Sequence, residues 1–275
     1  MDIFVFSYER GAYLANFLDS VRRVGWHGSV TIMDDGSTER RTLQVLERAE
    51  RDGFGVVRQP HSSDGLRGGL RENMQAALEL AAGPAVLFAQ DDMQIVRNIS
   101  AGEEEKISAL LDDVRNSPLL FPVFHLRNWK ASRRAKNFDF DARLRMPVRS
   151  LFHPLTGFSD VAVFSPERLR AAGLIYRYEE SGTSTLAYSL FGPMVSYPYP
   201  FLAFVPSPVV PRLGRRNRLR HPTRRVTPAR IDDMTDGDVE RLLSHGPAEV
   251  PFADDWLTVR SRTRRWSLRR TGWVG

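Results

Sequence analysis

The sequence predicts an α/β domain built on a mostly parallel sheet with helices on both faces. Through the first half of the chain, short apolar segments alternate with segments of helical periodicity. Two of the apolar segments end directly in an Asp-Asp pair. The chain has 275 residues, of which 42% are hydrophobic and 26% charged, so it can bury a core and has a globular composition.

Five strands are expected in the first half, and they cover Ile3–Ser7, Val30–Met33, Val56–Val57, Ala85–Ala89 and Leu119–Leu126. Apolar residues three or four positions apart predict the helices between and after them, over Leu14–Val21, Leu43–Ala49, Leu70–Ala81 and Ile107–Val114. Ser37 or Thr38 is the expected N-cap of the second helix. Ser100 and Glu103 form a capping-box pattern before the fourth.

The second half gives weaker signals. The segment from Asn128 to Leu151 is rich in Arg and Asp and has no clear periodicity, so we expect a mobile loop over the site. A strand is expected over Thr156–Phe164, and Ser165-Pro166-Glu167 is a good helix start. Two more helices are expected, over Tyr178–Phe191 and Met234–Ser244.

The composition excludes several kinds of site. The chain has no Cys, which rules out disulfides, thiolate metal ligands and a cysteine nucleophile. It opens on a strand-like segment without a charged leader region, so no signal peptide is expected. No apolar run approaches the roughly 20 residues of a membrane span. These features favour a cytoplasmic protein.

Basic charge is concentrated at the C-terminal end. The net charge is +6, yet residues 212–275 hold fifteen Arg against eight acids, and Arg212 to Arg230 hold eight Arg and no acid. This pattern indicates a solvated arm that can contact an anionic membrane surface peripherally. Nucleic-acid binding is not expected, because the Arg run lacks interleaved aromatic residues.

Asp-Asp occurs five times, but only Asp34-Asp35 and Asp91-Asp92 directly follow apolar strands. If those strands are parallel, both pairs lie at the same carboxyl edge of the sheet, where such sheets bind ligands. Clustered carboxylates need a compensating cation, and oxygen-rich sites suit Mg²⁺ or Mn²⁺, which keep positions open for phosphates. The alternative for Asp34-Asp35 is that these residues cap the following helix.

Three segments resemble the family-2 glycosyltransferases of the Rossmann-like GT-A fold: Phe6–Arg10, Ile32–Ser37 and Phe88–Asp92. The resemblance covers about residues 2–100. It implies that Asp92, with Asp91, binds the Mn²⁺ or Mg²⁺ that bridges the donor diphosphate. It also implies that the nucleotide sugar is bound by Ser7, Tyr8, Arg10, Asp34, Asp35, Arg71 (with Arg67 as its rival) and Asp91.

Two positions depart from the family pattern. The strand-four motif of the family is often Asp-x-Asp, and its first acid falls on Gln90 here. The first loop often carries Asn where this chain has Glu9. The choice of donor therefore stays open.

The family places its catalytic base in an acidic pair at the start of a later helix. By this resemblance Glu180, with Glu179 beside it, is the expected base, and Asp160 is its rival. His221 is the only reasonable candidate for a late metal ligand. The chain then divides into a nucleotide-sugar-binding half (1–127), an acceptor and catalytic half (128–211), and a basic arm with a short helix (212–275).

The function expected from these features is metal-dependent transfer of a sugar, with inversion, from a nucleotide-diphosphate donor to a hydroxyl of a saccharide or lipid-linked acceptor. One alternative is a nucleotidyltransferase, although that class needs a Gly-rich basic loop straight after the first strand. Another is a non-catalytic nucleotide-sugar binder that is degenerate at Gln90.

Overall fold

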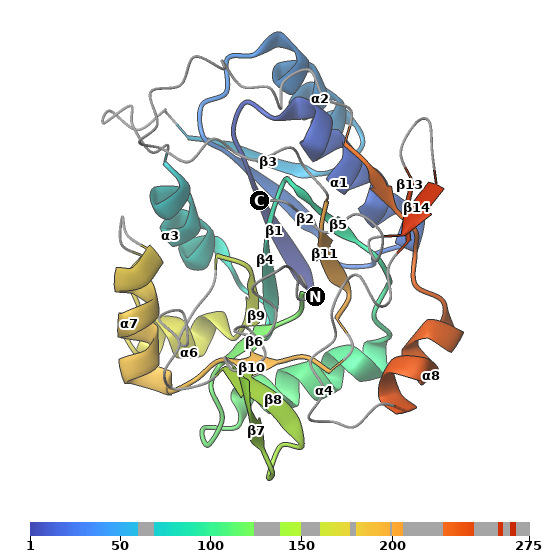
Figure 1. Cartoon of the computed structure of the whole chain (residues 1–275). Helices are drawn as coiled ribbons and strands as arrows, with labels where there is room; N and C mark the ends of the chain where they lie inside the picture. Colours follow the sequence, from blue (N-terminus) through green and yellow to red (C-terminus); the bar gives the residue numbers. More distant parts are fainter. Residues whose placement is uncertain are drawn as a thin grey trace, which may run out of the picture.

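The computed structural model of the chain describes residues 1–59, 69–123, 138–149, 160–176, 180–198, 200–205, 228–244, 258–260 and 265–267. Its centre is a nine-stranded sheet in the order β3-β2-β1-β4-β9-β6-β10-β8-β7 (Figure 1). Within these described residues, no helix is both long and apolar enough to cross a bilayer.

The first four strands are parallel, as the sequence predicts. They are β1 (Asp2–Ser7), β2 (Val30–Asp34), β3 (Gly55–Arg58) and β4 (Val86–Gln90), and β1 pairs with both β2 and β4. The helices α1 (Gly11–Val24), α2 (Arg40–Arg51) and α3 (Leu70–Leu80) connect them. Figure 1 shows α1 and α2 to one side of these strands and α3 to the other, so the expected α/β architecture is confirmed.

The rest of the sheet is mixed. The strand β9 (Ala162–Phe164) runs antiparallel between β4 and β6 (Leu119–Phe121), and β10 (Val195–Ser196) runs parallel to β6. The remaining helices in this part are α4 (Ala101–Asp112), which has the predicted capping box, α6 (Pro166–Ala171) and α7 (Glu180–Phe191). Because β9 is antiparallel, the sheet is only partly parallel at this end.

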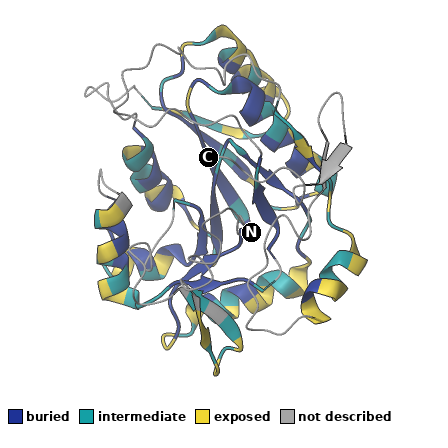
Figure 2. Cartoon of the chain, in the orientation of Figure 1, coloured by how far each residue is buried: buried dark blue, intermediate teal, exposed yellow. Residues whose placement is uncertain are grey.

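The core forms around the sheet. Phe88 on β4 makes edge contacts with Phe6 and Phe164, with ring centroids 4.9 and 4.6 Å apart. Buried residues concentrate on the strands and on the helix faces turned toward them, whereas the outer helix faces are exposed (Figure 2). A rigid sheet of this kind holds the loops at its carboxyl edge in fixed positions.

The prediction of a mobile loop over residues 128–151 is wrong for the described part. Residues 138–149 form a hairpin of β7 (Phe138–Asp141) and β8 (Met146–Arg149), which joins the sheet by pairing with β10. Asp141 accepts hydrogen bonds from the backbone N–H groups of Arg143 and Leu144, and this closes the turn locally. The sequence gives little sign of this hairpin, because its turn is charged and its partner strand β10 lies far away along the chain.

The helix α2 does not begin at the predicted cap. Its N-cap is Glu39, whose carboxylate accepts from the N–H of Thr42 at 3.0 Å. Ser37 and Thr38 are engaged elsewhere, because the Ser37 hydroxyl accepts from the N–H of Glu9 and the Thr38 N–H and hydroxyl donate to the Glu9 carboxylate.

The sequence analysis also did not predict β5 (Met93–Ile95) and β11 (Leu202–Phe204), which form a separate antiparallel pair. The expected strand over Leu119–Leu126 ends at Phe121, and residues 124–126 lie outside the described residues. Residues 156–159 of the expected strand over Thr156–Phe164 also lie outside them.

Part of the expected basic arm packs on the core. The strand β12 (Arg230–Ile231) pairs with β13 (Thr258–Arg260), which pairs with β14 (Arg265–Ser267). The Ile231 N–H donates to Gln94 Oε1 at 2.7 Å, and Arg23 on α1 pairs with both carboxylate oxygens of Asp233 at 2.7 and 2.8 Å. The final helix is α8 (Asp236–Ser244), which confirms the helix predicted over 234–244, whereas residues 212–227 of the predicted solvated stretch lie outside the described residues.

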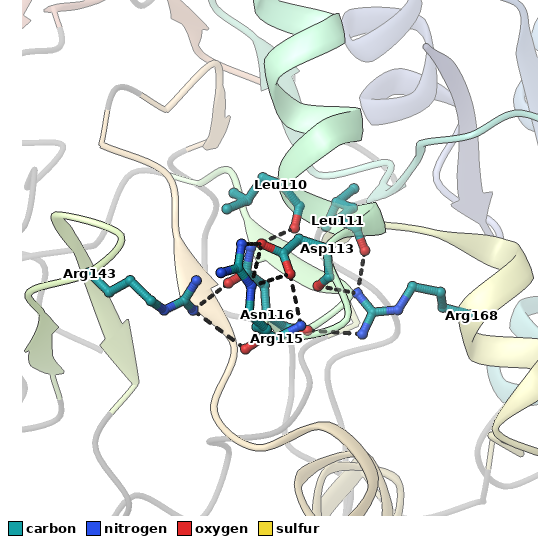
Figure 3. A network of polar contacts seen from close by, with 7 residues as sticks. All are labelled: Leu110, Leu111, Asp113, Arg115, Asn116, Arg143 and Arg168. Atoms are coloured by element: carbon teal, nitrogen blue, oxygen red, sulfur yellow. Dashed lines mark hydrogen bonds and ion pairs between the residues drawn. The ribbon is translucent and has the colours of Figure 1, made fainter.

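Arg168 on α6 holds the segment after α4 in place (Figure 3). Its guanidinium donates to the backbone carbonyls of Leu111, Asp113 and Asn116, the last two at 3.1 and 2.9 Å. The same segment carries an exposed ion pair between Arg115 and Asp113 at 2.7 Å. Arg168 therefore binds backbone carbonyls at the end of α4, whereas Arg115 forms an ion pair on the surface.

Arg168→Ala is expected to lower the free energy of unfolding by about 2–4 kcal/mol, because it leaves helix-end carbonyls without a charged donor. Arg115→Ala is the matched control, with an expected loss of about 0–1 kcal/mol for an exposed pair. Urea unfolding of the two variants measures both values. Equal losses would contradict the role given to Arg168.

Candidate active site

Both acidic pairs lie at the same carboxyl edge of the sheet. Ser7 at the end of β1 is in register with Asp34 at the end of β2. The N–H of Asp35 donates to the Ser7 carbonyl, and the N–H of Asp91 donates to the Phe6 carbonyl, both at 3.1 Å. The backbone thus joins the ends of β1, β2 and β4, as the sequence predicts for parallel strands.

Asp91 and Asp92 follow β4 and share one cation from the loop after β1. Arg10 Nη1 lies 3.1 Å from Asp91 Oδ1 and 3.2 Å from Asp92 Oδ2. The Ser7 hydroxyl donates to Asp91 Oδ2 at 2.9 Å. The side chains are 4% exposed for Asp91, 17% for Asp92 and 23% for Arg10, so the cluster is largely removed from water.

The electrostatics of this cluster follow from its burial. Burial raises the pKa of Asp91 to about 6, although the Arg10 charge opposes this shift. Burial also raises the pKa of Asp92, again against the influence of Arg10. Burial disfavours the charge on Arg10, but the two carboxylates outweigh it and raise its pKa above the ordinary value. Two adjacent buried carboxylates therefore favour a cation at this point.

Asp34 and Asp35 bind loop backbone rather than the start of α2. Asp34 Oδ2 accepts from the N–H of Ser37 at 2.9 Å, and Asp35 Oδ2 accepts from the N–H of Gly69 at 2.5 Å. Because α2 is capped by Glu39, the capping alternative for this pair is wrong. A Cβ at position 69 would overlap Asp35 Oδ1, so any other residue where α3 begins would require the Asp35 carboxylate to shift.

Glu9 braces the loop after β1, a role that the sequence analysis missed. Its backbone is left-handed (φ 54°), and its buried carboxylate accepts from the N–H groups of Thr38 and Glu39, both at 2.9 Å. The one hint of this role in the sequence is that Glu9 stands where the family pattern often has Asn. Tyr8, between the buried Ser7 and Glu9, is 36% exposed at the same edge.

Arg71 and Asp160 form a second ion pair, between α3 and the segment before β9. Arg71 Nη2 donates to Asp160 Oδ2 at 3.0 Å, and Nη1 donates to Oδ1. Burial, and then the Asp160 charge, raises the pKa of the neighbouring Tyr176 well above its ordinary value. The pair joins the predicted nucleotide-binding Arg71 to the rival catalytic base.

Some predicted site residues cannot be placed beside this edge. Glu179, Arg67 and His221 lie outside the described residues. Glu180 is the first residue of α7, and only its backbone is described. Gln90 ends β4 and is in register with Phe6, next to the metal-binding candidates.

The donor set at this edge suits a cation held by one or two carboxylates. The described residues contain no cluster of three or more His, Cys, Asp or Glu side chains that could hold a metal. However, Asp92 Oδ1 is buried and has no hydrogen-bond partner in the part of the chain that the structure describes. A buried, unsatisfied carboxylate oxygen is costly unless a ligand such as a metal ion satisfies it.

Comparisons with known proteins agree with this arrangement. Residues 2–98 match the model of the family described as Glycosyl transferase family 2. No curated protein matches the chain. The TarS 1–349 fragment from S. aureus is similar in structure, with a TM-score of 0.52 and 18% identity over 74% of this chain, which spans 59% of that fragment. The structure of S. aureus TarS is similar with a TM-score of 0.50 and 18% identity, over 75% of this chain and 37% of the TarS chain. These likenesses confirm the GT-A fold.

Proposed function

We propose, because residues 2–98 match the model of glycosyl transferase family 2, that the chain transfers a sugar from a nucleoside diphosphate to a hydroxyl acceptor. The observation that carries the proposal is the meeting of both acidic pairs at one carboxyl edge. One pair offers hydrogen-bond acceptors for a nucleoside, and the other offers ligands for a cation beside a diphosphate.

Mg²⁺ or Mn²⁺ is the proposed cofactor, held by Asp92 together with Asp91. The buried Asp92 Oδ1 without a partner supports this, as does the small number of carboxylates, which would leave positions for phosphate oxygens. The metal would stabilise negative charge on the diphosphate leaving group. Gln90, at the end of β4, is neutral and leaves the site with two carboxylates rather than three.

The other residues of the edge orient the donor in this proposal. Asp35, which the Gly69 N–H holds in place, accepts hydrogen bonds from base or ribose, and the half-exposed Tyr8 stacks beside them. Arg71 lies at the start of α3, where backbone N–H groups also favour anions. Asp160 fixes this arginine.

The acceptor side is proposed on chemical grounds. Inverting transfer needs a carboxylate that takes the proton of the acceptor hydroxyl, and Glu180 at the start of α7 is the proposed base. The acceptor is a saccharide or a lipid-linked hydroxyl. The Arg-rich stretch 212–230 supports contact with an anionic membrane surface, where a lipid-linked acceptor would be found.

The proposal predicts that the protein binds a nucleoside diphosphate in the presence of Mn²⁺, and that Asp35→Asn weakens this binding about 10–100-fold. The expected loss corresponds to a hydrogen bond to a charged acceptor, about 1.5–3 kcal/mol. Asn keeps the shape of the side chain and an oxygen for the Gly69 N–H. Titration calorimetry with UDP, GDP, ADP and dTDP measures the affinities.

Asp19→Asn is the matched control, because Asp19 is an exposed acid on α1 that forms a surface ion pair with Arg22. It is expected to bind as the unsubstituted protein does. Failure of every nucleoside diphosphate to bind would refute the proposed function. Unchanged affinity in Asp35→Asn alone would move the nucleoside away from this pair.

A further inference from the structure

The carboxylate oxygens at the end of β4 are almost fully occupied by groups of the chain itself. Asp91 Oδ2 accepts from Ser7, and Asp91 Oδ1 and Asp92 Oδ2 both face Arg10 Nη1. Of the four oxygens of Asp91 and Asp92, Asp92 Oδ1 is the one without a hydrogen-bond partner among the described residues. A divalent cation that takes a second oxygen from this pair must therefore take one that now bonds Arg10 or Ser7, and two of these three oxygens face Arg10.

Arg10 is suited to yield that oxygen. It precedes α1 on the loop after β1, and its side chain is long and 23% exposed, so its guanidinium can turn toward solvent. Ser7 can keep its bond to Asp91 Oδ2 while Arg10 leaves, because it holds the other oxygen. Two positive charges cannot share the same pair of buried carboxylates without strong repulsion.

We propose that Arg10 is the internal counter-cation of Asp91 and Asp92, and that it competes directly with the divalent metal for them. Without metal, its single positive charge offsets part of the negative charge of two carboxylates that would otherwise be buried without a cation. Metal binding displaces the guanidinium. The affinity for the metal alone is therefore lower than it would be if Arg10 did not compete for the two carboxylates. This inference rests on the metal site of the proposed function and adds a group that sets its affinity.

The test is binding of Mn²⁺ alone, without nucleotide, to Arg10→Gln and to the unsubstituted protein. Electron paramagnetic resonance counts free Mn²⁺ in each titration. Removal of the competing charge is expected to tighten Mn²⁺ binding about tenfold or more. Arg22→Gln, on the exposed face of α1, is the control and should leave Mn²⁺ affinity unchanged.

A second readout is thermal stability. Without metal, Arg10→Gln is expected to melt at a lower temperature, because it leaves the carboxylates without a cation. Saturating Mn²⁺ should then raise its melting temperature more than that of the unsubstituted protein. If Arg10→Gln does not fold, Arg10→Lys, which loses the guanidinium fork but keeps the charge, should fall between the two in Mn²⁺ affinity.

Equal or weaker Mn²⁺ binding in Arg10→Gln would overturn the inference, and so would an absence of Mn²⁺ binding in both proteins. Neither result depends on nucleotide. The proposed function fails separately, if Mn²⁺ binds but no nucleoside diphosphate does.

Discussion

Asp92→Asn is expected to abolish the dependence of nucleotide binding on Mn²⁺ and to lower turnover at least about a hundredfold. Asp92 carries a buried oxygen that has no hydrogen-bond partner among the described residues, and Asn removes its negative charge while keeping its shape. Arg10 keeps its contact with Asp91, so the loop after β1 has a remaining anchor. The loss should therefore be one of metal binding and not of folding.

Calorimetric titrations of the best-bound nucleoside diphosphate, with Mn²⁺ and with a chelator, measure the metal dependence, and donor turnover is measured beside them. Asp112→Asn is the matched control, since Asp112 is the exposed last residue of α4 and is also followed by an Asp. It should behave as the unsubstituted protein. If the unsubstituted protein binds nucleotide equally well with chelator, the metal role of Asp92 is wrong.

Local patterns explain why the parallel half could be predicted. Each strand there is a short apolar segment and each helix an amphipathic one, so periodicity identifies both. The capping box at Ser100 and Glu103 is a local signature of four residues, and the structure confirms it. The meeting of the two acidic pairs at one edge also follows from local information, because each pair directly ends a parallel strand.

The contacts that build the site could not be predicted in this way. Arg10 meets Asp91 across 81 positions of sequence, and Arg71 meets Asp160 across 89. No periodicity links such residues, since their approach depends on the order of strands in the sheet. The brace formed by Glu9 also displaces the cap of α2, because it engages Thr38 and orients Ser37 away from the helix.

Glu180→Gln is expected to lower kcat about 10²–10⁴-fold, the contribution of a general base, with little change in donor affinity. The base contacts the acceptor hydroxyl and not the nucleotide, so binding and turnover should separate. Glu180 begins α7, and a helix start can hold one of two adjacent acids toward the acceptor while the other points elsewhere. Glu179→Gln is therefore the matched control and should retain most of its turnover.

Asp160→Asn distinguishes the rival base from a positioning residue. Both oxygens of Asp160 accept hydrogen bonds from the guanidinium of Arg71, which makes this carboxylate the anchor of that arginine. Arg71 lies on α3 close to Gly69, whose N–H holds Asp35. Loss of the ion pair should then weaken nucleotide binding and leave kcat at saturating donor within about tenfold. If Asp160→Asn abolishes transfer with donor affinity intact, while Glu180→Gln remains active, the base lies before β9 and not on α7.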